Sequence, residues 1–229
     1  MIKAVSSVSS DAARQLQQLI LDGSLPPGSM LPGQRELSAT MGISRASLRE
    51  AISMLEALGL LSSRPGKGVV VTRGMQRGET ELPAGPEAIP AKDMFQYRIT
   101  LEPAAAALAA GRITPADAST LWSLQHDLER AIAGRDLVAA SEVDLSFHQR
   151  VARLCGNVLL DEAIADARGR LAHNLRLAFA DLGRIGETAE EHHQITLAIT
   201  AGDAHGAHDA MRAHLTRTAQ RAGIQLDLP

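Results

Sequence analysis

Four residues in the second half of the chain have the side-chain types and the spacing of a metal site. Asp144 and His148 stand four residues apart, so on a helix they project to the same side. His192 and His214 lie in two later segments with helical patterns. One carboxylate and three imidazoles suit a divalent ion with mixed nitrogen and oxygen preference, such as zinc, nickel or manganese. An octahedral ion with four protein ligands keeps positions open for a carboxylate or hydroxyl of a small molecule.

Spacing alone leaves other interpretations of these polar residues open. His193 is one residue, or about 100°, round the helix from His192, so both cannot face the same ion. Arg98 can hold an anion in bidentate fashion, or it can pair with Glu102, four residues later on the same helix. Asn174 can line the same cavity or belong to the polar face of an amphipathic helix. Each histidine taken singly can also serve only in packing or face solvent.

A series of amphipathic helices is expected to position these residues. Beyond about residue 90, aliphatic side chains recur at helical spacing, and no strand-like alternation is present. Helix-ending and helix-starting residues separate the periodic segments, among them Gly111, Thr114-Pro115 and Gly202-Asp203. The expected helices are 90–110, 114–133, 135–155, 157–180, 186–202 and 204–222. This pattern predicts an all-α antiparallel bundle.

The N-terminal part of the chain has the pattern of a winged helix-turn-helix. An amphipathic helix is expected at about 8–22, and a short one at 34–41 ends in a tight turn at Gly42. Ser44 occupies the position of an N-cap for the following helix. The run Gly-Lys-Gly-Val-Val-Val at 66–71 predicts a hairpin. The predicted fold is therefore mainly α, with a small β wing.

Arg45 and Arg49 give this N-terminal part its candidate DNA-reading surface. They are four residues apart and project together from the front of the second helix of the motif, which enters a major groove. Arginine suits bidentate contact with guanine. The charge distribution agrees, because residues 1–75 carry a net charge of +3 and the remainder carries −6. A basic head on an acidic body fits a protein of which one end meets a polyanion.

Residues from about 10 to 72 resemble the N-terminal domain of the GntR family of bacterial transcription regulators. Pro-Gly, Leu-Pro, Arg-Glu-Leu, Ser-Arg, Arg-Glu-Ala, Gly-Leu and Gly-x-Gly occur in the family's order. The resemblance implies that Arg35, Arg45 and Arg49 contact bases and phosphates, and that the Gly66-Lys67-Gly68 tip is the wing. The candidate DNA-binding residues are Arg35, Ser44, Arg45, Ser47, Arg49, Gly66 and Lys67.

Residues 92–222 resemble the all-helical effector domain, called FCD, of the FadR subfamily. The matching elements occur in the family's order: Arg98-x-x-Leu101-Glu102-Pro103, Asp144-x-x-Phe147-His148, Gly156-Asn157, Glu191-His192, Gly202-Asp203 and His214. In that family one Asp and three His hold a metal at the floor of a ligand cavity. The resemblance implies that Asp144, His148, His192 and His214 are metal ligands, with zinc the leading candidate. It also favours Arg98 as an effector-binding residue, with Asn174 a further candidate.

The expected organisation is a winged helix-turn-helix domain at 1–73, a Gly-, Glu- and Pro-containing linker at 74–90, and the helical domain at 91–229. The single cysteine, Cys155, excludes an intrachain disulfide and agrees with a reducing cytosol. No signal-peptide pattern or membrane-spanning stretch is present in the sequence. A soluble, cytoplasmic protein without a membrane partner is expected.

The predicted function is that of a ligand-responsive transcription factor and not of an enzyme. A homodimer is expected to bind a palindromic operator in double-stranded DNA. A small organic acid, bound by the metal and Arg98, is expected to weaken operator binding, the behaviour of a repressor. The alternatives are a metal-dependent enzyme acting on a small carboxylate, because such a metal can activate water, and an architectural DNA-binding dimer without an effector.

Overall fold

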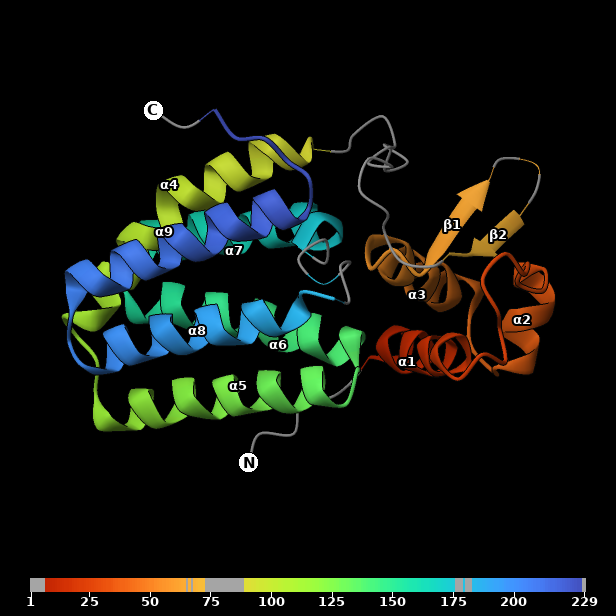
Figure 1. Ribbon diagram of the computed structural model, residues 1–229, viewed down its shortest axis with the longest axis horizontal. Helices are drawn as coiled ribbons and strands as arrows, with labels where there is room; N and C mark the ends of the chain where they lie inside the picture. Colours follow the sequence, from red (N-terminus) through yellow and green to blue (C-terminus); the bar gives the residue numbers. More distant parts are fainter. Residues whose placement is uncertain are drawn as a thin grey trace. The chain divides into compact units, whose positions relative to one another are not determined.

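The computed structural model describes residues 7–64, 66, 68–72, 89–175, 179 and 183–227, except for the side chains of residues 168–175. The chain divides into two compact units, Met1–Pro83 and Ala84–Pro229. The described residues form helices and one two-stranded sheet (Figure 1), as the sequence predicts. No helix in the described ranges is long and apolar enough to cross a membrane.

The first unit has the element order of a winged helix-turn-helix. Its elements are α1 (Val8–Leu21), α2 (Gln34–Thr40), α3 (Arg45–Ala57), β1 (Leu61–Arg64) and β2 (Gly68–Val71). Helices α1 and α2 both pack on α3, and β1 follows α3 closely. The core between them is aliphatic and includes the fully buried side chains of Leu16, Leu48, Leu55 and Leu58. Burial of these side chains holds the motif together.

The wing is an antiparallel hairpin in which Leu61 pairs with Val71 and Arg64 pairs with Gly68. An isolated bridge between Met30 and Val70 extends this pairing to the segment before α2. Val69 and Val71 are buried, so one face of β2 packs toward the unit's core. The hairpin is therefore anchored at its base, with the Gly66 turn exposed at its tip.

The turn between α2 and α3 is built as the sequence predicts. Gly42 has φ of +66°, a left-handed conformation that glycine adopts without strain. Ser44 is the N-cap of α3, and its side chain accepts a hydrogen bond from the backbone N–H of Ser47 at 3.0 Å. This cap satisfies one of the free N–H groups at the start of α3. The direction in which α3 leaves the turn is fixed in this way.

The second unit is all-helical. Its helices are α4 (Ala91–Ala110), α5 (Pro115–Ala133), α6 (Leu137–Leu154), α7 (Val158–Leu175), α8 (Ile185–Thr200) and α9 (Ala204–Arg221). Their bounds agree closely with the helices that the sequence predicts. The predicted helix 157–180 corresponds to α7, and residues 176–178 and 180 lie outside the described residues.

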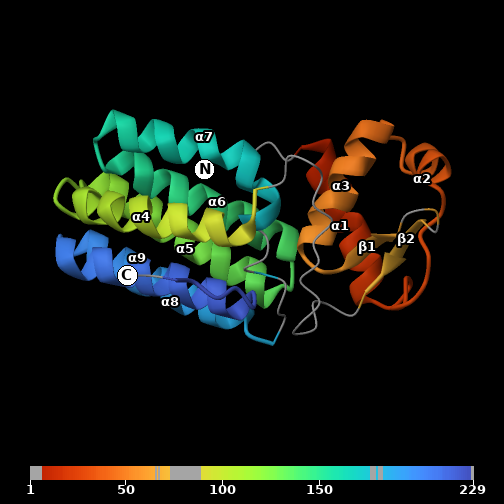
Figure 2. The same cartoon turned by 90° about the horizontal axis from the view of Figure 1, so that it is seen from above.

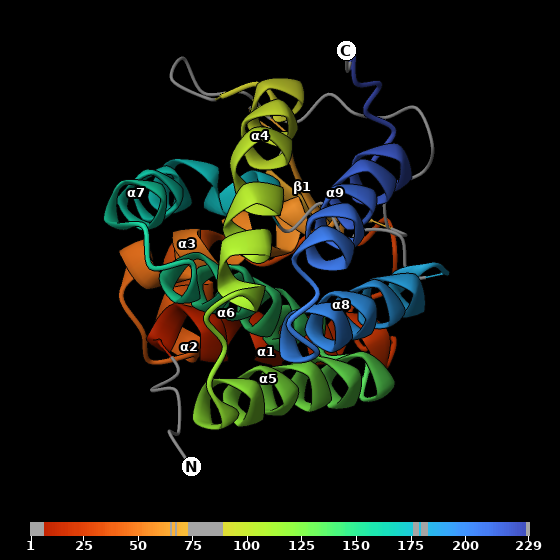
Figure 3. The ribbon, with the colours of Figure 1, turned by 90° about the vertical axis from the view of Figure 1, so that its left-hand side faces the viewer.

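Five of these helices form a closed ring when viewed along their axes (Figure 3). Around the ring, α4 contacts α9, α9 contacts α8, α8 contacts α5, α5 contacts α6, and α6 contacts α4. Helix α7 lies outside the ring and packs on α4 and α6, as the view from above also shows (Figure 2). Side chains that point inward from α4, α6, α8 and α9 therefore share one interior.

Two apolar clusters fill the ring at different heights. One includes Ala106 of α4 with Met211 of α9, and the other joins Met94 and Phe95 of α4 to Ala219 of α9. Because α4 and α9 run in opposite directions along each other, the residues between these positions on both helices face a layer between the clusters. Arg98 and Glu102 of α4 and His214 of α9 are buried polar residues between these positions.

Candidate metal centre

Asp144, His148, His192 and His214 converge in the layer between the two apolar clusters. Helix α6 supplies the first two, α8 supplies His192, and α9 supplies His214. One ligand atom from each lies within 4.8 Å of the others, and all four side chains are buried. Ligand atoms of a tetrahedral zinc ion are about 3.4 Å apart when each bond is about 2.1 Å. Small side-chain movements would therefore close the set around an ion.

The atoms that face one another in this cluster lack well-directed hydrogen bonds. Asp144 Oδ1 lies 3.0 Å from His192 Nε2 and 3.8 Å from His148 Nε2. Among the described residues, none of these three buried atoms has a hydrogen bond of acceptable direction. Buried polar atoms without partners are costly, and a bound cation would satisfy all of them at once. The donor set fits a divalent metal of the zinc, nickel or manganese type.

Glu102 and Arg98, both on α4, back His148. Glu102 Oε2 lies 2.6 Å from His148 Nδ1, with the ring turned away from the ideal hydrogen-bond line. Arg98 donates to the same carboxylate through Nε at 2.6 Å and through Nη2 at 3.3 Å. Both side chains are buried. The helix-surface pair considered for Arg98 and Glu102 is therefore formed, but it lies inside the bundle and beside a metal-ligand candidate.

Glu191 and Arg221 back His214 in a similar way. Glu191 Oε2 lies 2.9 Å from His214 Nδ1. Arg221 holds both oxygens of this carboxylate, with Nη1 2.7 Å from Oε1 and Nη2 2.8 Å from Oε2. A bidentate arginine on a carboxylate is among the strong hydrogen-bonded pairs. Helix α8 and the C-terminal turn of α9 are joined by this contact.

The surroundings of the cluster keep its carboxylates ionised. Burial alone opposes ionisation of Glu102, but Arg98 and His148 outweigh it and lower the pKa of Glu102 to about 2. Burial likewise opposes ionisation of Glu191, and Arg221 and His214 lower its pKa to about 2. For Asp144, burial is outweighed by His192, His148 and Arg98, and its pKa falls below the usual range.

Burial has the opposite effect on two of the imidazoles, because it disfavours their charged form. It lowers the pKa of His214 to about 3, against the opposing hydrogen bond from Glu191. It also lowers the pKa of His192, against the opposing effect of Asp144. Both rings are therefore neutral at pH 7, the form that binds a metal.

The charges of the buried residues leave one negative charge at the cluster. Arg98 and Arg221 balance Glu102 and Glu191, their respective partners. Metal-bound imidazoles are neutral, so in a loaded cluster Asp144 would contribute the remaining formal charge of −1. A divalent ion on this set would give a formal charge of +1. Such a centre would attract one carboxylate group.

The structure distinguishes His192 from His193. His192 is fully buried in the cluster, and its ring lies against Phe147 with the ring centres 4.4 Å apart. His193 is only partly buried and packs edge-on against Trp122 at 5.2 Å. Of the candidate effector-binding residues, Arg98 lies beside the cluster. Asn174 belongs to α7, and its side chain lies outside the described residues.

Glu191 and Arg221 are the residues of this site that sequence analysis did not select. Arg221 lies seven residues after His214, which is two helical turns, so it shares a face of α9 with that ligand candidate. Glu191 directly precedes His192. The spacing of Arg221 was a usable signal, but many arginines on amphipathic helices have such a spacing without a buried partner.

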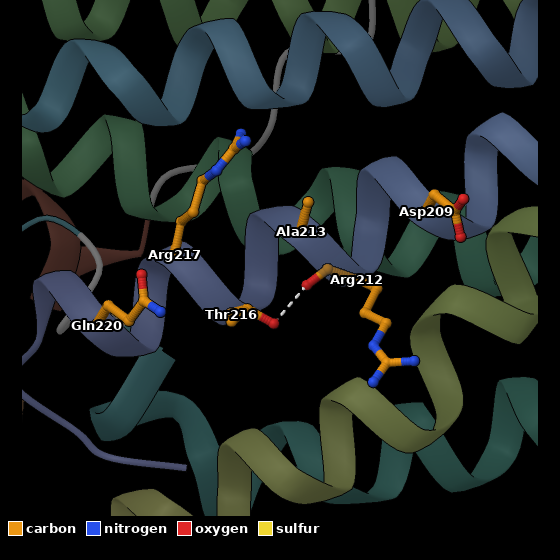
Figure 4. Close-up of a pocket in the computed structure, with 6 residues that line it drawn as sticks. All are labelled: Asp209, Arg212, Ala213, Thr216, Arg217 and Gln220. Atoms are coloured by element: carbon orange, nitrogen blue, oxygen red, sulfur yellow. Dashed lines mark hydrogen bonds between the residues drawn. The ribbon is translucent and has the colours of Figure 1, made fainter. Parts of the chain in front are cut away.

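An open pocket lies along α9. Asp209, Arg212, Ala213, Thr216, Arg217 and Gln220 line it (Figure 4). None of these residues belongs to the candidate metal cluster. The pocket is therefore a separate feature of the helix that carries His214.

The candidate DNA-binding residues of the first unit lie on α2, α3, the turn between these helices and the wing. Arg35, Arg45 and Arg49 are exposed. Ser47 is half-buried, and the Ser44 hydroxyl is already used in the cap of α3. Gly66 is exposed at the tip of the hairpin, whereas Lys67 lies outside the described residues. The arginines on α3 are therefore available to a polyanion.

Comparison with known proteins decides the family. The model for the FCD domain matches residues 93–217, and that for bacterial regulatory proteins of the gntR family matches residues 8–71. This chain belongs to the GntR family. GntR regulators bind DNA through the helix-turn-helix domain and an effector through the FCD domain, and this regulator has both.

Known relatives of this GntR-family regulator are transcriptional regulators. A protein of Escherichia coli K12, provisionally named as the L-lactate dehydrogenase operon regulatory protein, is 30% identical over 94% of this chain and 86% of its own. LutR of Bacillus subtilis is 28% identical over 86% of this chain and 93% of its own. The structure of Streptococcus agalactiae GntR covers 93% of this chain and 100% of its own, with 29% identity and a TM-score of 0.50. The enzyme considered from the sequence is therefore set aside.

Proposed function

We propose that this GntR-family regulator is a repressor of the FadR subfamily whose DNA affinity is controlled by a small organic acid at a metal-containing site. The observation that carries the proposal is the buried cluster of Asp144, His148, His192 and His214 in a chain that also presents exposed arginines on α3. A ligand must favour one arrangement of the DNA-binding heads to change operator affinity. The cytosol is the proposed location, because the operator is there.

Zinc is the first candidate for the metal, with nickel and manganese as alternatives. Asp144, His148, His192 and His214 would hold the ion, and its Lewis acidity would supply an attachment point for the effector's carboxylate. Arg98 lies close enough to Asp144 for their charges to interact, so it would also favour an anionic group there. Asn174 remains a candidate for a further effector contact.

A monocarboxylate is the best match to the charge of the proposed site. The loaded cluster would carry a formal charge of +1, which one carboxylate neutralises and a dicarboxylate or tricarboxylate exceeds. A 2-hydroxy acid could add its hydroxyl as a second ligand. Because one relative is named after an L-lactate dehydrogenase operon, L-lactate is the first acid to test.

Two chains are proposed to bind a palindromic operator, with one recognition helix per half-site. Arg35, Ser44, Arg45, Ser47 and Arg49 would contact the major groove and nearby phosphates. Gly66 and Lys67 would form the tip of the wing against the neighbouring groove. Phosphate contacts give such binding a steep dependence on salt.

Fluorescence anisotropy on duplexes tiled across the DNA upstream of this regulator's own gene tests the proposal. We expect salt-dependent binding to one palindromic duplex and a loss of affinity when L-lactate is added to the zinc-loaded protein. L-Malate and citrate serve as acids of higher charge, and a chelator removes the metal. If neither the chelator nor any of the acids changes the operator affinity, the protein is the architectural DNA-binding dimer. Tighter binding in the presence of L-lactate would contradict the repressor mechanism.

A further inference from the structure

Two buried carboxylates contact metal-ligand candidates from behind. Glu102 faces Nδ1 of His148, and Glu191 faces Nδ1 of His214. Each carboxylate also accepts hydrogen bonds from an arginine on both of its oxygens, Glu102 from Arg98 and Glu191 from Arg221. The two groups of residues come from different helix pairs, α4 with α6 and α8 with α9. The same Arg–Glu–His order is thus built twice around one cluster.

The order of these residues determines which ring nitrogen carries the proton. A carboxylate clamped by arginine is ionised and can only accept hydrogen bonds. The imidazole nitrogen beside it is then the N–H donor. His214 Nδ1 is hydrogen-bonded to Glu191, and His148 Nδ1 lies 2.6 Å from Glu102 Oε2, so that a rotation of the His148 ring would align its N–H. The other nitrogen, Nε2, keeps its lone pair, which is the electron pair that a metal needs.

We propose that Glu102 and Glu191 are positioning residues that fix the Nδ1–H tautomers of His148 and His214 and so direct both Nε2 lone pairs toward the metal. The inference rests on the metal site of the proposed function. It assigns Glu102 and Glu191 a role that they exert through His148 and His214. Arg98 and Arg221 serve this role by holding the two carboxylates in place.

His192 provides an internal comparison. Its Nε2 lies 3.0 Å from Asp144 Oδ1, whereas the contacts of Glu102 and Glu191 are with His148 and His214. The His192 ring is packed against Phe147. The tautomer of His192 therefore does not depend on Glu102 or Glu191, and it should not respond when either is replaced.

Glu102→Gln and Glu191→Gln test the proposal by reversing the hydrogen bond. In Glu102→Gln, Arg98 Nε holds the amide oxygen at the Oε1 position, so the amide N–H₂ turns toward His148. In Glu191→Gln, Arg221 Nη1 holds the amide oxygen in the same way, and the N–H₂ that turns toward His214 also gives up the bond from Nη2. The imidazole nitrogen Nδ1 must then accept, and the proton moves to Nε2. Glu190→Gln is the matched control, because Glu190 is exposed on α8 and is bonded only to Gln194 in the described structure.

The first measurement uses metal-free protein. Side-chain ¹⁵N NMR distinguishes the two neutral tautomers of each histidine. We expect Nδ1–H at His148 and His214 in the wild-type protein, a change confined to His148 in Glu102→Gln, and a change confined to His214 in Glu191→Gln. Unchanged tautomers in both variants would overturn the proposal, whatever happens to the metal.

The second measurement is a competition titration with Zn²⁺ alone at pH 7. Loss of a hydrogen-bonding partner behind a metal ligand typically weakens metal binding by about 10- to 100-fold. We expect losses of that order in Glu102→Gln and Glu191→Gln, and wild-type affinity in Glu190→Gln. If wild-type protein binds no zinc, the proposed metal site fails. If all four proteins bind zinc equally, the site stands and the positioning role is wrong.

Glu191→Asp covers the case in which a glutamine variant does not fold. It keeps the negative charge beside Arg221 but withdraws the carboxylate from His214 by about one methylene group. We expect an intermediate loss of zinc affinity and a mixture of tautomers at His214. Wild-type affinity with a fully retained Nδ1–H tautomer would show that contact with the carboxylate is not required.

Discussion

Nδ1 of His214 lies 2.9 Å from Oε2 of Glu191, and both side chains are buried between α8 and α9. The glutamate comes directly before His192, the cluster residue that α8 contributes. His192 is therefore itself a candidate metal ligand, and the adjacent Glu191 contacts the site through His214 of the next helix. A change in the centre would be felt by both helices.

Removal of His192 is expected to abolish metal retention. His192→Ala deletes one of four converging ligand groups, and we expect purified protein to lose its bound metal by elemental analysis. A ligand present at about 100 times its dissociation constant stabilises a protein by about 2.7 kcal/mol, so the melting shift caused by zinc should also disappear. DNA binding should remain close to that of the wild type.

His193→Ala is the matched control, because His193 packs on Trp122 outside the cluster. It should keep both the metal and the zinc-induced melting shift. If His193→Ala loses the metal and His192→Ala retains it, His193 and not His192 is the metal ligand.

Arg45→Ala is expected to weaken operator binding and relax base preference. A bidentate arginine–guanine contact contributes about 1–3 kcal/mol of discrimination. Anisotropy with operator and scrambled duplexes should show the loss mainly on the operator. Arg130→Ala is the control, because Arg130 is exposed on α5 in the other unit, and this variant should bind as the wild type does. Equal losses on both duplexes would make Arg45 a phosphate contact instead.

Ser44→Ala is expected to destabilise the DNA-binding unit through the start of α3. Loss of an N-cap side chain costs about 0.5–2 kcal/mol of the free energy of unfolding. Urea denaturation followed by circular dichroism measures the difference. Ser146→Ala is the control, since its exposed hydroxyl only donates to a carbonyl within α6, and its effect should stay within about 0.5 kcal/mol. If Ser44→Ala lowers the free energy of unfolding no more than Ser146→Ala does, the Ser44 cap does not stabilise the unit.

Metal-free protein is expected to lose stability as the pH falls from 6.5. Burial lowers the pKa of His192, and it lowers the pKa of His214 to about 3. Below pH 6.5 the unfolded chain therefore binds protons that the folded chain excludes, and stability decreases as pH falls. The slope is at most about 1.4 kcal/mol per pH unit for each excluded proton.

Chelator-treated protein should accordingly show a lower denaturation midpoint at pH 5.5 than at pH 7. His205→Ala is the control, because His205 is exposed on α9, and this variant should keep the pH dependence. A midpoint that is constant between pH 7 and pH 5 would contradict the neutral buried histidines.

Much of the fold was predictable from the sequence because its signals are local. Helical periodicity, the Gly42 turn and the Ser44 cap depend on residues a few positions apart, and the structure has them where the pattern indicates. The positions of the candidate metal ligands followed from helical spacing and from a family resemblance. The sequence also left Arg98 with two interpretations, and local spacing could not choose between them.

The tertiary structure decided which side chains are buried together. Helix spacing places Arg98 beside Glu102, but only the packing of α4 on α6 brings this pair to His148. The pairing of Arg221 with Glu191 joins residues thirty positions apart, and no periodicity within one helix reports it. Burial then sets the charges, because the cost of desolvation depends on everything that surrounds a group. The sequence determined the helices and their ligand candidates, and helix packing determined how those ligands are held.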